Sequence, residues 1–126
     1  MITFKILITA LMLVETGGHP NPSQSIGDGG ASVGILQIGK AVVDDVNTFY
    51  SDSNYSYQDR YDPEKSREIC YKYLTYWGKV YQRKTGKEPT AEIYAKMWNG
   101  GCYAWKKEGV VAERLNTYWN KVKGHL

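Results

Sequence analysis

The sequence predicts a small, mainly α-helical α+β domain with a central buried helix and at most a minor β segment. Three observations support this: an apolar run near the N-terminus, a long helical pattern with a clear start at Asp62-Pro63, and no strand pattern long enough for a large sheet. The chain has 126 residues, of which 42% are hydrophobic and 23% charged. These values suit one soluble domain, so we expect residues 1–126 to form a single domain without a second.

The first predicted element is the apolar run at residues 6–14, which ends at Glu15 just before Gly17 and Gly18. A helix that is hydrophobic nearly all round belongs in the middle of a core, and the glycines would end it. Lys5 followed by this run also resembles the start of a secretory signal peptide, although no A-x-A-like cleavage site follows. The run is too short to span a bilayer. We therefore expect a buried helix, and no stable insertion into a membrane.

The next segment, residues 16–33, is rich in glycine and contains two prolines, which predicts a loop. Residues 33–38 follow as a short extended or turn segment. Residues 41–50 have the pattern of a short helix, and a polar, tyrosine-rich loop then leads to Asp62.

The clearest helix starts where Asp62 can act as N-cap with Pro63 in the first helical position, and it should run to about Lys84. Apolar side chains recur along it at intervals of three and four residues, which predicts a wide buried face. Thr90 can cap a further helix to about Trp98, and residues 110–123 predict the last one, with Gly124 after it. The predicted core residues of the long helix are Ile69, Tyr73, Tyr76, Trp77 and Val80, with a second stripe of Cys70, Leu74 and Tyr81.

Charge and cysteine content exclude little. The net charge of +3 favours anionic surfaces such as a cell wall, a membrane or nucleic acid without selecting one. Cys70 and Cys102 make no disulfide framework and lack metal-ligand spacing, so we expect both to be reduced and buried, with a single bridge as the alternative. His19 and His125 are far apart in the sequence. We expect no metal and no cofactor.

Glu15 is the candidate catalytic residue. A carboxyl group at the edge of an apolar environment has its charged form disfavoured and its pKa raised, so it can donate a proton near neutral pH. Glycoside hydrolysis needs such an acid, on a rigid element beside an open groove, to protonate the leaving oxygen. The alternative is an ordinary solvated residue at a helix end, which is the commoner role of glutamate.

Four segments, taken in order, resemble the lysozyme-like superfamily, in particular goose-type lysozymes and soluble lytic transglycosylases. Residues 15–19 (E-T-G-G-H) resemble their E-S-x-x-N catalytic motif, and residues 34–38 (G-I-L-Q-I) resemble their G-L-M-Q-hydrophobic segment. Residues 61–64 (Y-D-P-E) are similar to F-D-P-E. Residues 97–101 (M-W-N-G-G) are similar to A-Y-N-A-G and to the W-N-G-G segment of short phage lysins.

This resemblance implies a lysozyme-like fold and an activity. Glu15 would be the general acid that cleaves the β-1,4 bond between N-acetylmuramic acid and N-acetylglucosamine in peptidoglycan. Gln37 and Asn99 would line the groove, although both residue types also commonly satisfy loop backbone groups.

Trp98 stands where the family has a tyrosine whose hydroxyl is expected near the catalytic carboxyl. An indole N–H can donate a hydrogen bond but cannot accept one. The partner of the acid would then be Trp98 itself or a nearby phenol such as Tyr94 or Tyr103. Trp98 would serve as a stacking platform for a sugar ring or as core packing.

Asp28 is the candidate for the base of an inverting hydrolase, which activates water about 6.5–9.5 Å from the acid. Counted back from Gly34, it falls where goose-type lysozymes have an aspartate and lytic transglycosylases typically have serine. This favours a hydrolase, but Gly39 replaces a further aspartate of the goose-type enzymes, and Asp28 is also an ordinary turn residue. An anhydro-forming lytic transglycosylase therefore stays an alternative.

Aromatic residues alternate with basic residues at residues 105–107 and 118–123, as in proteins that bind nucleic acid or a membrane surface. This pattern suggests a different class of function. Helix packing explains the same pattern, and a non-catalytic wall-binding domain is a further alternative. We expect peptidoglycan glycan strands as the partner, no nucleic acid, and a monomer. The resemblance suggests a phage or prophage endolysin made in the host cytoplasm without a signal peptide and acting on the cell wall.

Overall fold

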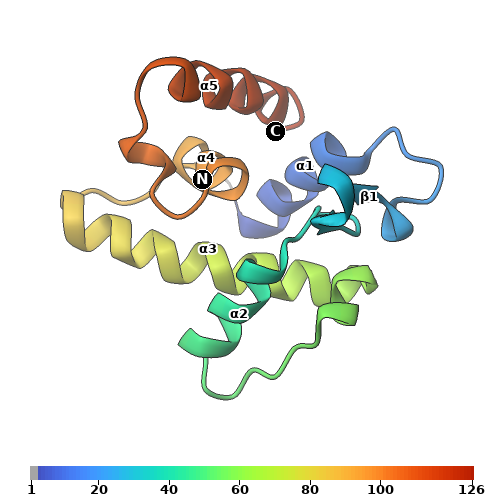
Figure 1. Ribbon diagram of the computed structural model, residues 1–126. Coiled ribbons are helices and arrows are strands. Elements are labelled where there is room, and N and C mark those ends of the chain that lie inside the picture. The colour runs from blue at the N-terminus through green and yellow to red at the C-terminus, as the bar shows by residue number, and fades with distance from the viewer. Residues whose placement is uncertain (1–2) are drawn as a thin grey trace. The chain divides into compact units, whose positions relative to one another are not determined.

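The computed structural model describes residues 3–126, and over this range the chain forms five α-helices and one two-stranded antiparallel sheet (Figure 1). The predicted mainly helical fold with a minor β segment is confirmed. The helices are α1 (Phe4–Thr16), α2 (Lys40–Phe49), α3 (Pro63–Thr85), α4 (Ala91–Gly100) and α5 (Gly109–Lys123), and the strands are β1 (Ile26–Gly27) and β2 (Ser32–Val33).

The chain divides into two compact units. Within the described residues, unit 1 contains residues 3–11 and 74–126, and unit 2 contains Met12–Tyr73. Helices α1 and α3 each contribute residues to both units. The single domain expected from the chain length stays a prediction.

Unit 1 is built from the start of α1, the end of α3, and helices α4 and α5. Thr90 caps α4 as predicted, because its hydroxyl accepts a hydrogen bond from the Ile93 amide at 3.2 Å. Helix α5 and the short 3-10 helix Ala104–Lys106 both pack against α4. The core of this unit consists of Leu7, Ile8, Ala10, Leu11, Leu74, Val80, Tyr81, Ala95, Met97, Ala104, Leu115, Tyr118 and Val122.

Unit 2 joins a small hairpin to α2 and the first half of α3. In the hairpin Ile26 pairs with Val33 and Gly27 with Ser32, and Val33 also bridges to Ile38. Asp62 caps α3 as predicted, because its carboxylate accepts a hydrogen bond from the Lys65 amide at 3.0 Å. The core of this unit consists of Val33, Ile35, Leu36, Ile38, Val43, Val46, Ile69, Cys70 and Tyr73.

Helix α1 corrects one expectation, since it is buried on one side only. Leu7 and Leu11 are buried, whereas Ile6 and Leu13 are 47% and 41% exposed. An apolar run of nine residues places side chains all round a helix, but neighbouring elements cover only part of that surface. The apolar pattern therefore predicted the helix correctly and overestimated its burial.

The cysteines correct another expectation. Within residues 3–126 neither cysteine forms a disulfide, and Cys70 is fully buried, as expected. Cys102 is only half-buried, because it lies in the loop directly after α4. No helix in the described part of the chain combines the length and apolar character needed to cross a membrane.

Candidate functional site

Glu15 lies in the last turn of α1, where it is half-buried. The next residue, Thr16, is buried, and its hydroxyl donates a hydrogen bond to the Ile35 carbonyl at 2.8 Å. A buried hydrogen bond of this kind holds two segments in register. The end of the helix that carries Glu15 is thereby fixed to the segment 34–38.

A buried thiol forms part of the surroundings of Glu15. Burial raises the pKa of Cys70 well above its ordinary range, and the negative charge of Glu15 raises it further. A charge acts strongly on a neighbour where water is excluded between them. The Glu15 carboxylate therefore lies within electrostatic range of the buried interior of α3, and the Cys70 thiol stays protonated.

Gln37 holds the 34–38 segment together. Its backbone is left-handed, with φ of 53°, and its side-chain amide donates to the Gly34 carbonyl at 2.9 Å and to the Ser25 carbonyl at 3.4 Å. Its side-chain oxygen occupies the space that a Cβ at Gly27 would need. Gln37 thus has the alternative role considered for it, which is to form hydrogen bonds with backbone groups of the loop. Its contact with a substrate in the groove stays a prediction.

Arg60 is a structural residue of this site that the sequence interpretation missed. It is only 6% exposed, and its guanidinium donates to the Ile38 carbonyl at 3.1 Å and the Tyr57 carbonyl at 2.8 Å. The backbone carbonyl of Arg60 accepts a hydrogen bond from the Ser66 hydroxyl at 2.7 Å. The same carbonyl oxygen lies where a Cβ at position 34 would be, so only glycine fits there. The sequence gives no signal for the contact with the 34–38 segment, because the Ile38 carbonyl lies 22 residues before Arg60.

Asp28 is exposed at the tip of the hairpin, with φ of 51°. Its carboxylate accepts a hydrogen bond from the Ser32 hydroxyl at 2.8 Å, which spans the turn. Aspartate commonly occupies such turn positions for this reason. The turn role considered for Asp28 is therefore observed, and its role as catalytic base stays a prediction.

The remaining candidates belong to unit 1. Trp98 and Asn99 lie in the last turn of α4, Trp98 half-buried and Asn99 exposed. Tyr103 is 37% exposed and packs edge-on against Trp77, with ring centroids 5.7 Å apart. The predicted roles of Asn99 in lining the groove and of Trp98 or Tyr103 as partner of Glu15 stay predictions.

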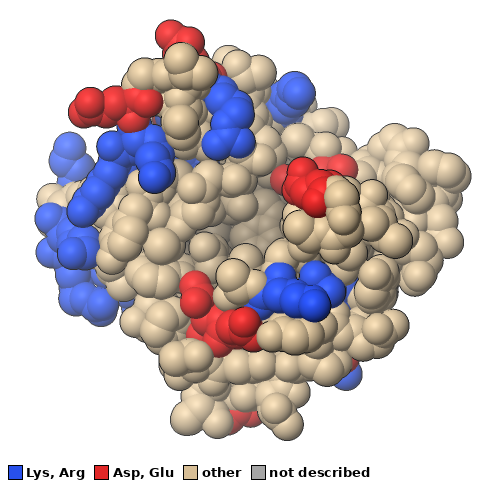
Figure 2. Space-filling model, viewed as in Figure 1, with Lys and Arg blue, Asp and Glu red and all other residues tan. Residues whose placement is uncertain are grey.

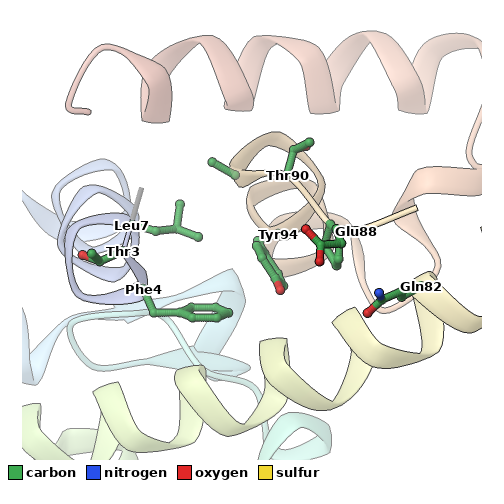
Figure 3. Close-up of a pocket in the computed structure, with 9 residues that line it drawn as sticks. Thr3, Phe4, Leu7, Gln82, Glu88, Thr90 and Tyr94 are labelled. Carbon is green, nitrogen blue, oxygen red and sulfur yellow. The ribbon is translucent and has the colours of Figure 1, made fainter. Parts of the chain in front are cut away.

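Tyr94 lines a cavity of about 590 Å³ in unit 1 (Figure 3). Its ring lies 4.8 Å from that of Phe4, and a Cβ at Gly78 would come within 2.7 Å of it. Figure 3 shows Phe4 and Leu7 extending from α1 toward Tyr94, and Glu88 on the side of Tyr94 that faces away from α1. The lining residues include one carboxylate, Glu88, so this cavity lacks the acid pair of an inverting glycosidase.

No protein-family model matches this chain, and no curated protein matches it. Among residues 3–126, no three His, Cys, Asp or Glu side chains are grouped so that they could hold a metal ion.

Proposed function

We propose that this chain is a peptidoglycan muramidase in which Glu15 is the general acid. The acid would protonate the leaving oxygen of the β-1,4 bond between N-acetylmuramic acid and N-acetylglucosamine. The proposal starts from the four sequence segments that resemble the lysozyme-like superfamily. It further includes a phage or prophage origin, synthesis in the host cytoplasm, action on the cell wall, and a monomeric state.

The observation that carries the proposal is the hydrogen bond between the Thr16 hydroxyl and the Ile35 carbonyl. It joins the segment that contains Glu15 to the segment that contains Gln37. Arg60, directly before the Y-D-P-E segment, donates to the carbonyl of Ile38. Three of the four segments, which are far apart in the sequence, are thus tied together within unit 2.

The surroundings of Glu15 also support an acid role. The residue is half-buried at the end of a rigid helix, and its charge acts on a thiol that is fully buried. Glycoside hydrolysis needs its acid on a rigid element that is partly shielded from water. A solvated helix-end glutamate would lack both features.

A second candidate is a lytic transglycosylase, and the position of Asp28 favours it. The carboxylate of Asp28 is exposed and takes part in the hairpin turn. Cleavage by internal attack of the sugar needs no water-activating base, whereas an inverting hydrolase does. Mass spectrometry of digested peptidoglycan separates the two, because the anhydro product is lighter by one water.

The test of the site is the Glu15→Gln variant in a turbidity assay on a peptidoglycan suspension. We expect the clearing rate to fall at least about 100-fold, because the amide cannot donate the proton, with the fold retained. Glu113→Gln is the matched control, since it makes the same chemical change on the exposed surface of α5. Clearing by Glu15→Gln at the rate of the unmodified chain would refute the assignment.

A further inference from the structure

Charge is divided unequally between the two units. Unit 1 carries eleven lysines and arginines against four glutamates, a net charge of +7, whereas unit 2 carries five basic against nine acidic residues, a net charge of −4. The overall charge of +3 conceals this difference. A single-sign excess of this size attracts counter-charged polymers and is not required for folding.

Part of the excess is held on a surface formed by Lys84, Tyr103, Trp105 and Lys106, which we term the basic aromatic surface. The Lys84 and Lys106 ammonium groups lie 5.8 Å and 5.0 Å from the centre of the Tyr103 ring, so they are at most about 11 Å apart, the sum of these distances. This is close to the screening length of about 10 Å at 0.1 M salt, so their fields overlap. Figure 2 shows Lys and Arg side chains gathered over the end of α3 and the segment after α4.

These two charges are not compensated. Both lysines are exposed, and the ion pairs found within residues 3–126 are Lys65 with Asp59 and Lys96 with Glu92. An ammonium that packs on a ring instead of on a carboxylate keeps its charge available to a ligand.

The aromatic rings are used to hold the lysines. Lys106 lies over both Tyr103 and Trp105, at 5.0 Å and 5.2 Å. Trp105 also packs edge-on against Tyr81, with centroids 5.2 Å apart, and its indole nitrogen is buried without a hydrogen-bond partner. Single-stranded nucleic acid is bound by rings whose faces are open to bases. Rings already contacted by ammonium groups and by other rings suit a ligand that is recognised by charge alone.

Membrane adsorption requires a different surface. Helices that bind at a membrane surface insert a continuous apolar face into the lipid, below their lysine and arginine residues. On the basic aromatic surface the large exposed hydrophobic side chain is Tyr103, at 37%. The surface therefore offers positive charge with little apolar area to insert.

We propose that the basic aromatic surface binds an anionic polyol-phosphate polymer of the bacterial cell wall. The charge pattern favours an anionic polymer without stacking bases, and the choice of a phosphate polymer of the wall rests on the proposed function. Binding would retain the enzyme on the wall through contacts remote in sequence from Glu15. Because the contacts are ionic, affinity falls as the salt concentration rises.

The test uses the full chain, and binding is measured without cleavage because the ligand contains no glycosidic bond. The ligand is purified poly(glycerol phosphate), titrated by calorimetry at 50 and 150 mM NaCl. We expect the double variant Lys84→Gln/Lys106→Gln to weaken binding at least about tenfold and to reduce the salt dependence. Tyr103→Leu should weaken it about threefold, because the ring positions both ammonium groups.

The control is Lys121→Gln/Lys123→Gln, which removes the same charge from exposed positions at the end of α5 in the same unit. This control variant should bind the polymer nearly as tightly as the chain in which Lys84 and Lys106 are unchanged. Equal binding by the two double variants would overturn the proposal. So would tighter binding of single-stranded DNA, or of vesicles with anionic lipid, than of the polymer at equal phosphate concentration.

The outcome is separate from that of the proposed function. Polymer binding that depends on Lys84 and Lys106 can be found even if Glu15→Gln still clears peptidoglycan. In that case the assignment of Glu15 as catalytic acid is wrong, and the assignment of the basic aromatic surface as a binding site is supported. If Glu15→Gln abolishes clearing and the lysine variants bind unchanged, the surface assignment fails alone.

Discussion

At the scale of the residue, Gly34 is the position that tolerates a side chain least. Its φ of 83° is in the left-handed region, and a Cβ would overlap the carbonyl oxygen of Arg60. That carbonyl cannot move away easily, because it accepts the hydrogen bond from the buried Ser66 hydroxyl. Two separate penalties therefore oppose any residue other than glycine here.

We predict that Gly34→Ala lowers the free energy of unfolding by about 3 kcal/mol or more, as measured by urea denaturation. Gly86→Ala is the control, since Gly86 has a similar φ of 73° but no atom lies within 4 Å of the place that a methyl group would take there. It should cost only the backbone penalty, about 1 kcal/mol. Equal losses in the two variants would show that the Arg60 carbonyl relaxes.

Cys70 gives a prediction about pH. Its pKa is raised in the folded chain, first by burial and then by the charge of Glu15. Above about pH 8.5 the unfolded thiol loses its proton while the folded one keeps it, so this contribution to stability is complete below that pH and is lost as the pH rises. We expect Cys70→Ala to reduce the fall in unfolding free energy between pH 8 and pH 10, by up to about 1.4 kcal/mol per pH unit.

The measurement is urea denaturation at several pH values, and the slope with pH is read separately from any constant loss caused by the smaller side chain. Cys102→Ala serves as the control, because Cys102 is only half-buried. An unchanged slope in Cys70→Ala would mean that other groups account for the pH dependence.

At the scale of the element, helix starts were predicted well and the hairpin was not. Asp62 and Thr90 mark their helices by hydrogen bonds to amides three residues later, which is a local pattern that a sequence displays directly. The strands β1 and β2 have two residues each, too few for an alternating pattern. The neighbouring segments are held by contacts made across the sequence, since Gln37 donates to the Ser25 carbonyl and Arg60 to the Ile38 carbonyl.

The link between α1 and the 34–38 segment can be tested by Thr16→Val, which keeps the shape of the side chain and removes the hydroxyl. The Ile35 carbonyl then loses a buried donor, so we expect a loss of about 1–3 kcal/mol in unfolding free energy. Peptidoglycan clearing should also fall if Glu15 acts beside this segment.

Thr9→Val is the matched control, because the Thr9 hydroxyl bonds within α1, to the Lys5 carbonyl at 2.9 Å, at an exposed position. It should change stability by less than about 0.5 kcal/mol. A similar effect of both variants would mean that Thr16 acts only within its own helix.

At the scale of the whole molecule, α1 and α3 each supply residues to both units. Loss of α3 would remove core side chains from both units, for example Leu74 from unit 1 and Ile69 from unit 2. Loss of α1 would remove Leu7 from unit 1 and the buried Thr16 from unit 2. The two units should therefore unfold together, as a single domain does.

All four tryptophans, at positions 77, 98, 105 and 119, belong to unit 1, so their fluorescence reports on that unit alone. We predict that the urea transition followed by tryptophan fluorescence coincides with the transition followed by far-ultraviolet circular dichroism, which records helices of both units. Two separated transitions would show that the units unfold independently.

Some features of the residues proposed for the site are determined by neighbours in sequence and could be predicted. The end of an apolar helix at Glu15 and the turn role considered for Asp28 both follow from local patterns. The hold of Arg60 on the 34–38 segment and the closeness of Cys70 to Glu15 depend on tertiary packing. The predicted roles of Tyr94, Trp98, Asn99 and Tyr103 toward the substrate stay predictions.

The fit between Gln37 and Gly27 restricts how related chains can diverge. The side-chain oxygen of Gln37 fills the volume that any β-carbon at position 27 would take. A larger residue at 27 therefore requires the Gln37 side chain to move, which gives up the hydrogen bonds that its amide donates to the Gly34 and Ser25 carbonyls. Among homologues, a side chain at position 27 should therefore accompany a change at position 37 more often than chance predicts.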